Sequence, residues 1–383
     1  MSSWHSLHVH HHDPATEADL VLDAVRPAFA AVAVDVDAVY FGRHWRRGPH
    51  LRLNLLVGEE KWPRVRAVVT EIVAAHQLAH PSTAELDEEA LAPLHSQLAV
   101  LEVESGPLHP FHPDNSIVEE PYDQRLHVFT TVAASEAMAA FAADTTEQTF
   151  RMYEYLRGGG ALAPLALDLM WATASVASIP FVEGGSPIER GMLSLRSHAD
   201  AFISRTADPD AYRAAFVRTF DRQREALTAR LAAVEAAVEG GGPELPLVTD
   251  WVAAVREHQP RLARLTVAGE LLQDGALAPR LPTRRLSDFH GLLLSGHGHE
   301  AFRADDIWFT TFKTMLNYLY LQLGRLGLRP DDRALLCHLA VDTIEAAHGI
   351  TAIDAFNRYV VSADTSWRSQ GEAWVARATA DAR

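Results

Sequence analysis

Residues 4–77 change from a period of two to a helical period and back, and this pattern predicts an α+β fold. Apolar and polar residues alternate as they do in strands over three runs: 4–12, 36–45 and 50–57. Helical runs lie at 13–32 and at 59–77. The order strand, helix, hairpin, helix indicates an open sandwich of packed helices and a mainly antiparallel sheet.

From residue 80 onwards the pattern is mostly helical. Residues 80–124 contain six prolines and predict an irregular excursion around one short helix, at about 86–100. Residues 123–132 have the pattern of a strand that returns to the sheet. The clearest helix is 208–238, with Asp208 as its cap and apolar residues at spacings of three, four or seven. Further helical runs lie at 134–156, 163–177, 307–328 and 329–349.

These runs predict one compact unit with three regions. Residues 1–135 form a sheet region with a basic hairpin, and residues 136–280 form a mainly helical insertion. Residues 281–383 form a C-terminal helical region that completes the active site. A chain of this length is able to bury a core large enough for such an arrangement.

The composition is that of a globular protein without disulfides. Of 383 residues, 48% are hydrophobic and 22% are charged, which excludes a largely disordered chain. The net charge of -16 argues against a nucleic acid as partner, because binding phosphates needs a basic surface. The sequence shows no signal peptide and no apolar run long enough to span a membrane. Together with a single cysteine, Cys337, this predicts a cytoplasmic protein that does not act at a membrane.

Signals for cofactors are weak. Histidines crowd the first strand: His5, His8, His10, His11 and His12. A zinc site there would lack a cysteine or carboxylate at ligand spacing, so we interpret them as strand-face residues with some exposed imidazoles. The glycine triplets 158–160 and 240–242 lack the Lys-Ser/Thr of a phosphate-binding loop. We therefore expect no metal and no other cofactor, and a buried, inert thiol at Cys337.

Two polar segments are candidates for a substrate site. In the hairpin, Arg43, His50 and Arg52 are predicted to project from one side of the sheet, where a guanidinium can clamp a carboxylate or amide oxygen. The alternative is charge that only solvates a turn. In residues 189–202 a dense polar group lies between apolar flanks and indicates a polar network or a site: Ser194, Arg196, Ser197 and His198.

A third polar segment lies in the predicted helix 307–328. Thr314, Asn317 and Tyr318 fall on one face of this otherwise apolar helix, and Tyr320 lies at the margin of that face. Hydrogen-bonding groups on such a face are suited to act on a substrate. The alternative interpretation is an aromatic core whose hydroxyl groups have partners within the protein.

Three stretches carry a resemblance to a known family: WHSLHVHHHDPATEADLVLDAVRPAF, VYFGRHWRRGPHLRLNL and LNYLYLQLGRLGL. They resemble the elimination-domain fold of lanthipeptide dehydratases, which also occurs as stand-alone proteins in thiopeptide biosynthesis. A chain of 383 residues leaves no room for the large glutamylation domain of full-length dehydratases. The resemblance implies one of two activities. One eliminates glutamate from glutamylated serine or threonine. The other, pyridine synthesis, joins two dehydroalanines of a thiazole-containing peptide in a formal four-plus-two cycloaddition and then releases water and the leader peptide.

Departures from the eliminase pattern favour pyridine synthesis. Eliminases carry HLRLR in the hairpin and HMxxNRLG near the C-terminus. This chain has HLRLN, with Asn54 in place of the second arginine. It also has YLQLGRLG, with Tyr320 in place of the histidine and Gly324 in place of the asparagine. The segment SLRSHADAF also resembles pyridine synthases. A non-catalytic scaffold that presents a precursor peptide to other enzymes is a third alternative.

For a pyridine synthase, the resemblance implies roles for the polar segments. The catalytic residues are Tyr320, Thr314, His198 and Ser197. The substrate-binding residues are Arg52, His50, Arg43, Arg196, Ser194, Asn317 and Tyr318. The partner is a modified precursor peptide, and Arg46 and Arg47 are expected to bind its acidic leader, with Arg43 helping to steer it. A homodimer is left open.

Overall fold

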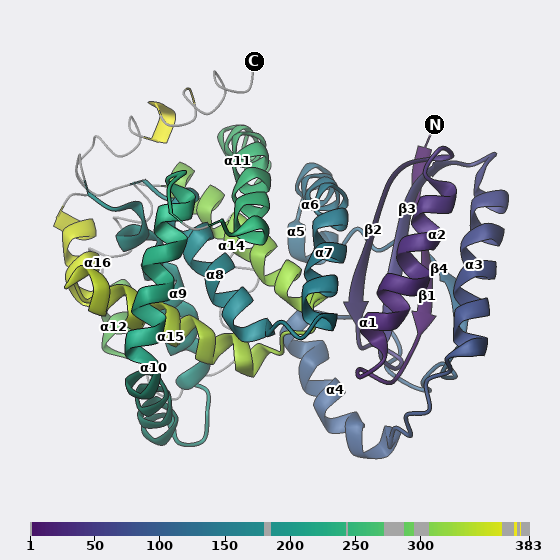
Figure 1. Cartoon of the computed structure of the whole chain (residues 1–383), viewed down its shortest axis with the longest axis horizontal. Coiled ribbons are helices and arrows are strands. Elements are labelled where there is room, and N and C mark those ends of the chain that lie inside the picture. Colours follow the sequence, from purple (N-terminus) through teal and green to yellow (C-terminus); the bar gives the residue numbers. More distant parts are fainter. Residues whose placement is uncertain are drawn as a thin grey trace. The chain divides into compact units, whose positions relative to one another are not determined.

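The computed structural model describes residues 2–179, 185–242, 244–271, 287–294, 306–361, 371–373 and 376. The chain divides into two compact units (Figure 1). Unit 1 comprises Met1–Gly160 and Gly324–Gly327, and unit 2 comprises Ala161–Leu323 and Leu328–Arg383. Residues 281–286 and 295–305, at the start of the predicted C-terminal region, lie outside the described residues.

A four-stranded antiparallel sheet of order β2-β3-β1-β4 forms the centre of unit 1 (Figure 1). Its strands are β1 (Ser2–His10), β2 (Val36–His44), β3 (His50–Gly58) and β4 (Ile117–Glu120). The predicted α+β class and antiparallel hairpin are confirmed. At the hairpin turn Gly48 has a φ of 97°, and a Cβ there would lie 2.9 Å from Nε2 of His12, so the position requires glycine.

The two faces of this sheet differ in polarity because successive side chains along a strand point to opposite sides. Phe41 marks the apolar face, and its ring stacks on Phe150 with centroids 5.6 Å apart. The buried apolar residues of this face are Leu7, Val9, Phe41, Leu51, Leu53, Leu55 and Val57. The opposite face is polar and aromatic, and it comprises Trp4, Ser6, His8, His10, Tyr40, His44, His50, Arg52 and Asn54.

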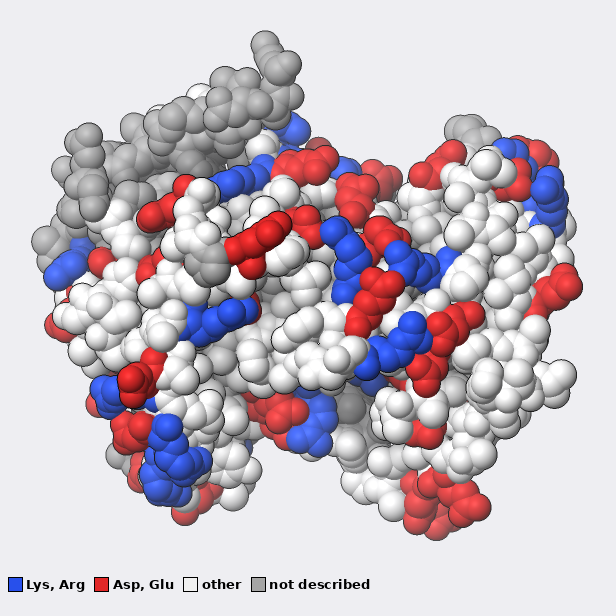
Figure 2. All heavy atoms as spheres, viewed as in Figure 1, with Lys and Arg blue, Asp and Glu red and all other residues white. Residues whose placement is uncertain are grey.

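Helices complete unit 1. The predicted helix at 13–32 forms as α1 (Glu17–Leu20), a π-helical turn (Val21–Val25) and α2 (Arg26–Val32). The other helices are α3 (Trp62–Ala79), α4 (Glu88–Glu102), α5 (Leu126–Phe129), α6 (Val132–Asp144) and α7 (Thr146–Arg157). On the face of the molecule drawn in Figure 2, basic and acidic side chains are interspersed. Ion pairs in unit 1 include those of Arg26 with Glu154 and of Arg157 with Asp23.

The prediction of a strand at 123–132 is wrong. These residues contain the short helix α5, and the strand that joins the sheet is β4, a few residues earlier. Pro121 follows β4 directly and has no N–H to continue the ladder. Arg125 and Thr130, with φ of 50° and 64°, have a backbone conformation that strands do not adopt.

Unit 2 is helical over its described residues. It contains α8 (Leu162–Val176), α9 (Pro187–Ile203), α10 (Pro209–Val238), α11 (Pro246–Val267), α12 (Asp288–Leu293), α15 (Pro330–His348) and α16 (Ala352–Val361). It also contains most of α14 (Asp306–Arg325). None of the described helices has both the length and the apolar character that crossing a membrane requires.

Two local features of unit 2 determine where α10 begins and how closely α9 approaches α8. The predicted helix at 208–238 is confirmed as α10, and Oδ1 of Asp208 accepts a hydrogen bond from the N–H of Ala211 at 3.0 Å. Helix α9 contacts α8 so closely that a Cβ on Gly191 would lie 2.4 Å from the carbonyl oxygen of Ala174. Glycine at this position therefore lets α9, which carries the polar residues singled out by the sequence, approach the buried helix α8.

Candidate functional site

Helices α9, α14 and α15 bring together a tyrosine, a histidine and a cysteine in unit 2. The hydroxyl oxygen of Tyr320 lies 3.0 Å from Nδ1 of His198 and 3.4 Å from Sγ of Cys337. The rings of Tyr320 and His198 meet edge to face, with centroids 5.0 Å apart. Two residues that the sequence placed on separate segments are therefore direct partners, and the predicted buried thiol is the third member.

All three groups rest in their uncharged forms. Burial raises the pKa of the Tyr320 hydroxyl well above its usual value, and it raises that of the Cys337 thiol to about 11. Burial also lowers the pKa of His198 to about 3, and the positive charge of Arg333 acts in the same direction. Tyr320 therefore keeps its proton, and its hydroxyl oxygen lies within hydrogen-bond distance of both Nδ1 of His198 and Sγ of Cys337.

Arg333 completes the surroundings of Tyr320. Its guanidinium carbon lies 4.6 Å from the centroid of the Tyr320 ring, which is the arrangement of a cation–π contact. The sequence analysis did not single out Arg333. It follows Tyr320 by thirteen residues, on the next helix, so only the packing of α15 on its neighbours reveals the contact.

A second imidazole stands next to Ser197. The hydroxyl oxygen of Ser197 lies 3.2 Å from Nε2 of His290 on α12, and Nδ1 of His290 lies 3.2 Å from the hydroxyl of Ser287. Ser287 also caps α12, since its hydroxyl accepts the N–H of His290 at 3.1 Å. Both Ser197 and His290 are partly exposed. The sequence analysis missed His290; the Ser-x-x-His capping pattern is the local signal that marks it.

The predicted polar face of α14 divides between different environments. Tyr318 is 1% exposed and belongs to the core, whereas Asn317 is exposed. The hydroxyl of Thr314 donates to the carbonyl oxygen of Thr310 at 2.8 Å. Thr314 and Asn317 lie on the same accessible side of α14, so their roles stay predictions, whereas Tyr318 packs in the core.

Arg196 and Ser194, also on α9, differ in their surroundings. The guanidinium of Arg196 is buried and donates from Nη2 to Asp342 at 2.6 Å and to Glu345 at 3.1 Å. Its Nη1 lies 3.3 Å from Nδ1 of His338. These contacts show that Arg196 joins α9 to α15, and its role in substrate binding stays a prediction. Ser194 is partly exposed, on the same side of α9 as His198.

In unit 1 the hairpin cations lie on different faces of the sheet. Arg43 pairs with Leu51 and projects from the apolar side, where its Nε donates to Oε2 of Glu17 at 2.9 Å. His50 and Arg52 project from the polar side. The prediction that these three residues share one side is wrong, since the hairpin register places Arg43 out of phase with the other two.

The remaining hairpin cations have intramolecular partners. Nη1 of Arg52 lies 3.4 Å from Oδ2 of Asp123, and Asn54 beside it is 5% exposed. In the turn, Nη1 of Arg46 donates to the carbonyl oxygen of Ser105 at 2.6 Å, and Nε of Arg47 donates to that of Pro110 at 3.1 Å. A guanidinium has five N–H donors, so each of these three arginines has donors in addition to those in the contacts above.

Histidine rings form a contiguous row along the polar face of the sheet, in which His8 and His50 are stacked and the other pairs are tilted. Ring centroids lie 4.6 Å apart for His8 and His50, 4.7 Å for His10 and His50, and 4.5 Å for His10 and His112. The expectation of exposed imidazoles is wrong for four of the predicted residues, which are buried: His8, His10, His11 and His12. Burial lowers the pKa of His8 to about 2 and that of His10 to about 3, so the row is uncharged at neutral pH.

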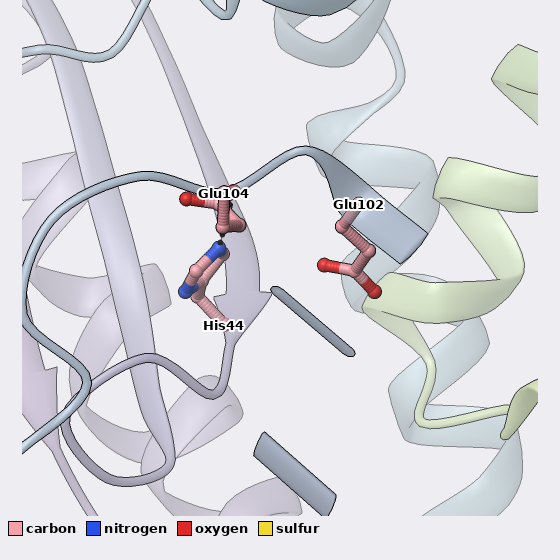
Figure 3. A group of neighbouring side chains, drawn as sticks. All are labelled: His44, Glu102 and Glu104. Carbon is pink, nitrogen blue, oxygen red and sulfur yellow. Dashed lines mark hydrogen bonds and ion pairs between the residues drawn. The ribbon is translucent and has the colours of Figure 1, made fainter. Parts of the chain in front are cut away.

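Among the described residues, His44, Glu102 and Glu104 bring three metal-ligand atoms within 4.8 Å of one another (Figure 3). Hydrogen bonds made by this cluster already fix which nitrogen of His44 carries the proton. The N–H of Arg46 donates to Nδ1 of His44 at 3.1 Å, so the proton lies on Nε2, which donates to Glu104 at 3.1 Å. A metal would need the lone pair of Nε2, and the positive charge of Arg52 acts on Glu104. The residues fit a hydrogen-bonded cluster better than a metal site.

Comparisons with known proteins place the chain in a family. The model of the family described as lantibiotic biosynthesis dehydratase C-term matches residues 4–344. The structure entitled pyridine synthase, TbtD, from thiomuracin biosynthesis is 35% identical, with a TM-score of 0.73. The match covers 91% of this chain and 99% of that one. The structure of TsrL is 20% identical, with a TM-score of 0.67 and coverage of 95% and 99%, and it shares the fold. No curated protein in the comparison matches the chain significantly.

Proposed function

The chain belongs to the lantibiotic biosynthesis dehydratase C-terminal family, and within that family we propose that it is a pyridine synthase of thiopeptide biosynthesis. One observation carries the proposal. The match to the pyridine synthase TbtD, at 35% identity, extends over 91% of this chain and 99% of that one. The Tyr320–His198 pair supports it, because a hydroxyl and a neutral imidazole stand where the resemblance expects the acid and base.

The proposed substrate is a precursor peptide with a leader, a thiazole-bearing core and two dehydroalanines. In the reaction an amide becomes its iminol tautomer and serves as an azadiene toward the second dehydroalanine. Two carbon–carbon bonds form, the iminol hydroxyl leaves as water, and the leader leaves as its carboxamide. No net oxidation or reduction occurs. The enzyme has to align the two partners and move protons at the iminol and at both leaving groups.

Tyr320 and His198 are suited to the tautomerisation. The Tyr320 hydroxyl keeps its proton at neutral pH and can hydrogen-bond the amide oxygen as it becomes an iminol. As the Tyr320 proton moves to the amide oxygen, the neutral imidazole of His198 takes the proton that leaves the amide nitrogen and returns it to the phenol oxygen. The Cys337 thiol holds the phenol oxygen in place. A variant without the Tyr320 hydroxyl therefore loses proton transfer while keeping the shape of the site.

Ser197 and His290 form a second proton-transfer pair for the leaving groups. Ser197 directly precedes His198 along α9, and both residues are partly exposed. Loss of water and loss of the leader carboxamide each require a proton to reach a departing oxygen or nitrogen. The hydroxyl of Ser197, in contact with an imidazole whose other nitrogen meets Ser287, can relay that proton.

The decisive experiment is mass spectrometry of a bis-dehydroalanine thiazole peptide, with its leader, after incubation with the protein. We expect a macrocyclic product together with free leader carboxamide, the two formed in equal amounts. Unchanged peptide would refute the proposal. Loss of glutamate from a glutamylated peptide would instead identify an eliminase. The role of the second pair is tested with His290→Gln, which should lower kcat at least tenfold and alter its pH profile. The exposed His80→Gln serves as its matched control.

A further inference from the structure

Unit 1 contains a cavity of about 1120 Å³ beside the start of β1. Three parts of the unit form its walls: the first strand with its neighbours Ala38 and Leu56, the segment 121–127, and helix α6. Its volume slightly exceeds the range of about 300–1,000 Å³ that is typical of ligand sites. The cavity touches four consecutive residues of β1, Ser2 to His5, which point to alternate faces of the sheet. The cavity therefore contacts β1 where, among the described residues, one edge of this strand has no neighbouring strand.

The open side is the edge of β1 beyond the end of β4. Strand β4 pairs with β1 only from Ser6 to Val9. Further along, the N–H of His10 donates to the carbonyl oxygen of Ser116 at 2.8 Å, so the even-numbered residues of β1 direct their main-chain groups to this side. Trp4 is one of them. Within the described part of the chain, its N–H and C=O have no hydrogen-bond partner on that side, and they form an edge that an extended peptide can pair with.

Aromatic rings lie next to this edge. The rings of Trp4 and Tyr122 are stacked, with centroids 5.4 Å apart and planes at 21°. The hydroxyl of Tyr122 lies 2.9 Å from that of Tyr40, which fixes its ring. Trp4 and Tyr122 are both partly exposed. A flat aromatic group of a ligand can stack against this pair.

The charge of the cavity wall selects against acidic ligands. Four carboxylates line it, Glu59, Asp123, Glu136 and Asp144, against the single guanidinium of Arg125. A row of ligand carboxylates would be repelled by the wall as a whole, whereas an uncharged peptide segment would not.

We propose that this cavity binds the thiazole-bearing core of the precursor peptide, laid as a short added strand beside Trp4, and that it does not bind the acidic leader. This inference rests on the proposed function for the identity of the peptide. Thiazoles and dehydroalanines are flat and uncharged, so they match the ring stack and are not repelled by the carboxylates. Amides between the rings pair with the main chain of Trp4.

The test is the binding of two fluorescein-labelled probes, measured by fluorescence polarisation. One probe is a synthetic bis-dehydroalanine thiazole core without a leader, and the other is a glutamate-rich leader peptide. The variant Ala140→Trp fills the cavity from α6, and Val132→Trp places the same side chain on an exposed position of that helix outside the cavity. We expect Ala140→Trp to weaken core binding at least tenfold and to leave leader binding unchanged, while Val132→Trp changes neither.

A second measurement does not depend on the folding of any variant. Methylation of one amide nitrogen in the core probe removes a strand-pairing hydrogen bond, so affinity for the unaltered protein should fall about tenfold. Equal affinities for methylated and unmethylated cores, or unchanged core binding by Ala140→Trp, would overturn the inference. Failure of the proposed function has a different signature: the protein forms no pyridine, yet core binding still depends on Ala140.

Discussion

Mild acid should destabilise unit 1, because its sheet buries histidines that cannot take up a proton. Burial lowers the pKa of His8 to about 2, of His10 to about 3 and of His44 to about 4. In the unfolded chain a histidine has a pKa of about 6.5. Below that value the unfolded state binds protons that the folded state excludes, so stability is complete above pH 6.5 and falls as the pH falls.

The size of the effect follows from this difference. At pH 5.5 one such histidine costs RT ln(1 + 10), about 1.4 kcal/mol of unfolding free energy, so the three together cost about 4 kcal/mol relative to pH 7.5. That is a large share of the 5–15 kcal/mol, roughly, that stabilises a domain. Burial acts to raise the pKa of Glu104, but its hydrogen bond with His44 and the charge of Arg52 lower it to about 2. Glu104 therefore stays ionised between pH 5.5 and pH 7.5 and does not contribute to the pH dependence of the unfolding free energy.

The assay is urea denaturation followed by tryptophan fluorescence at pH 7.5, 6.5 and 5.5. His10→Leu removes one member of the row, and its stability should fall by about 1.4 kcal/mol less than that of the unaltered protein over the range. The exposed His127→Gln should follow the unaltered protein. Identical pH slopes for the unaltered protein and His10→Leu, or a gain of stability on acidification, would refute the reasoning.

Three further predictions follow from contacts in the two units. Tyr320→Phe should bind peptide normally but lower kcat about a hundredfold, measured by product formation, whereas the exposed Tyr155→Phe should be as active as the unaltered protein. Arg46→Glu combined with Arg47→Glu should weaken binding of an acidic leader about tenfold at low salt and less at high salt; unchanged polarisation of a labelled leader would exclude these residues as its site. Gly191→Ala should destabilise unit 2 by about 1–3 kcal/mol in urea denaturation, because its Cβ meets the backbone of α8 at 2.4 Å, and a neutral result would show that the helices can separate.

Local patterns in the sequence were enough to predict most elements. The alternation of residues 36–45 and 50–57 around a Gly-Pro turn corresponds to β2 and β3, and the capped apolar repeat at 208–238 corresponds to α10. These features depend on residues close together in the chain, so a single sequence contains them. The strand wrongly predicted at 123–132 shows the limit, since β-forming residues there were overruled by Pro121 and by the backbone turns that follow.

The sequence predicted several residues of the candidate site, but it did not predict which of them contact one another. Tyr320 and His198 were both singled out, yet 122 positions separate them and nothing local pairs them. Arg333 and His290 went unnoticed because each gains its role only from the helix packed against it. The sequence by itself determined which residues carry hydrogen-bonding chemistry and which faces of an element are apolar. Only the tertiary structure decided which of these residues meet, because strand register and helix packing follow from the sum of many long-range contacts.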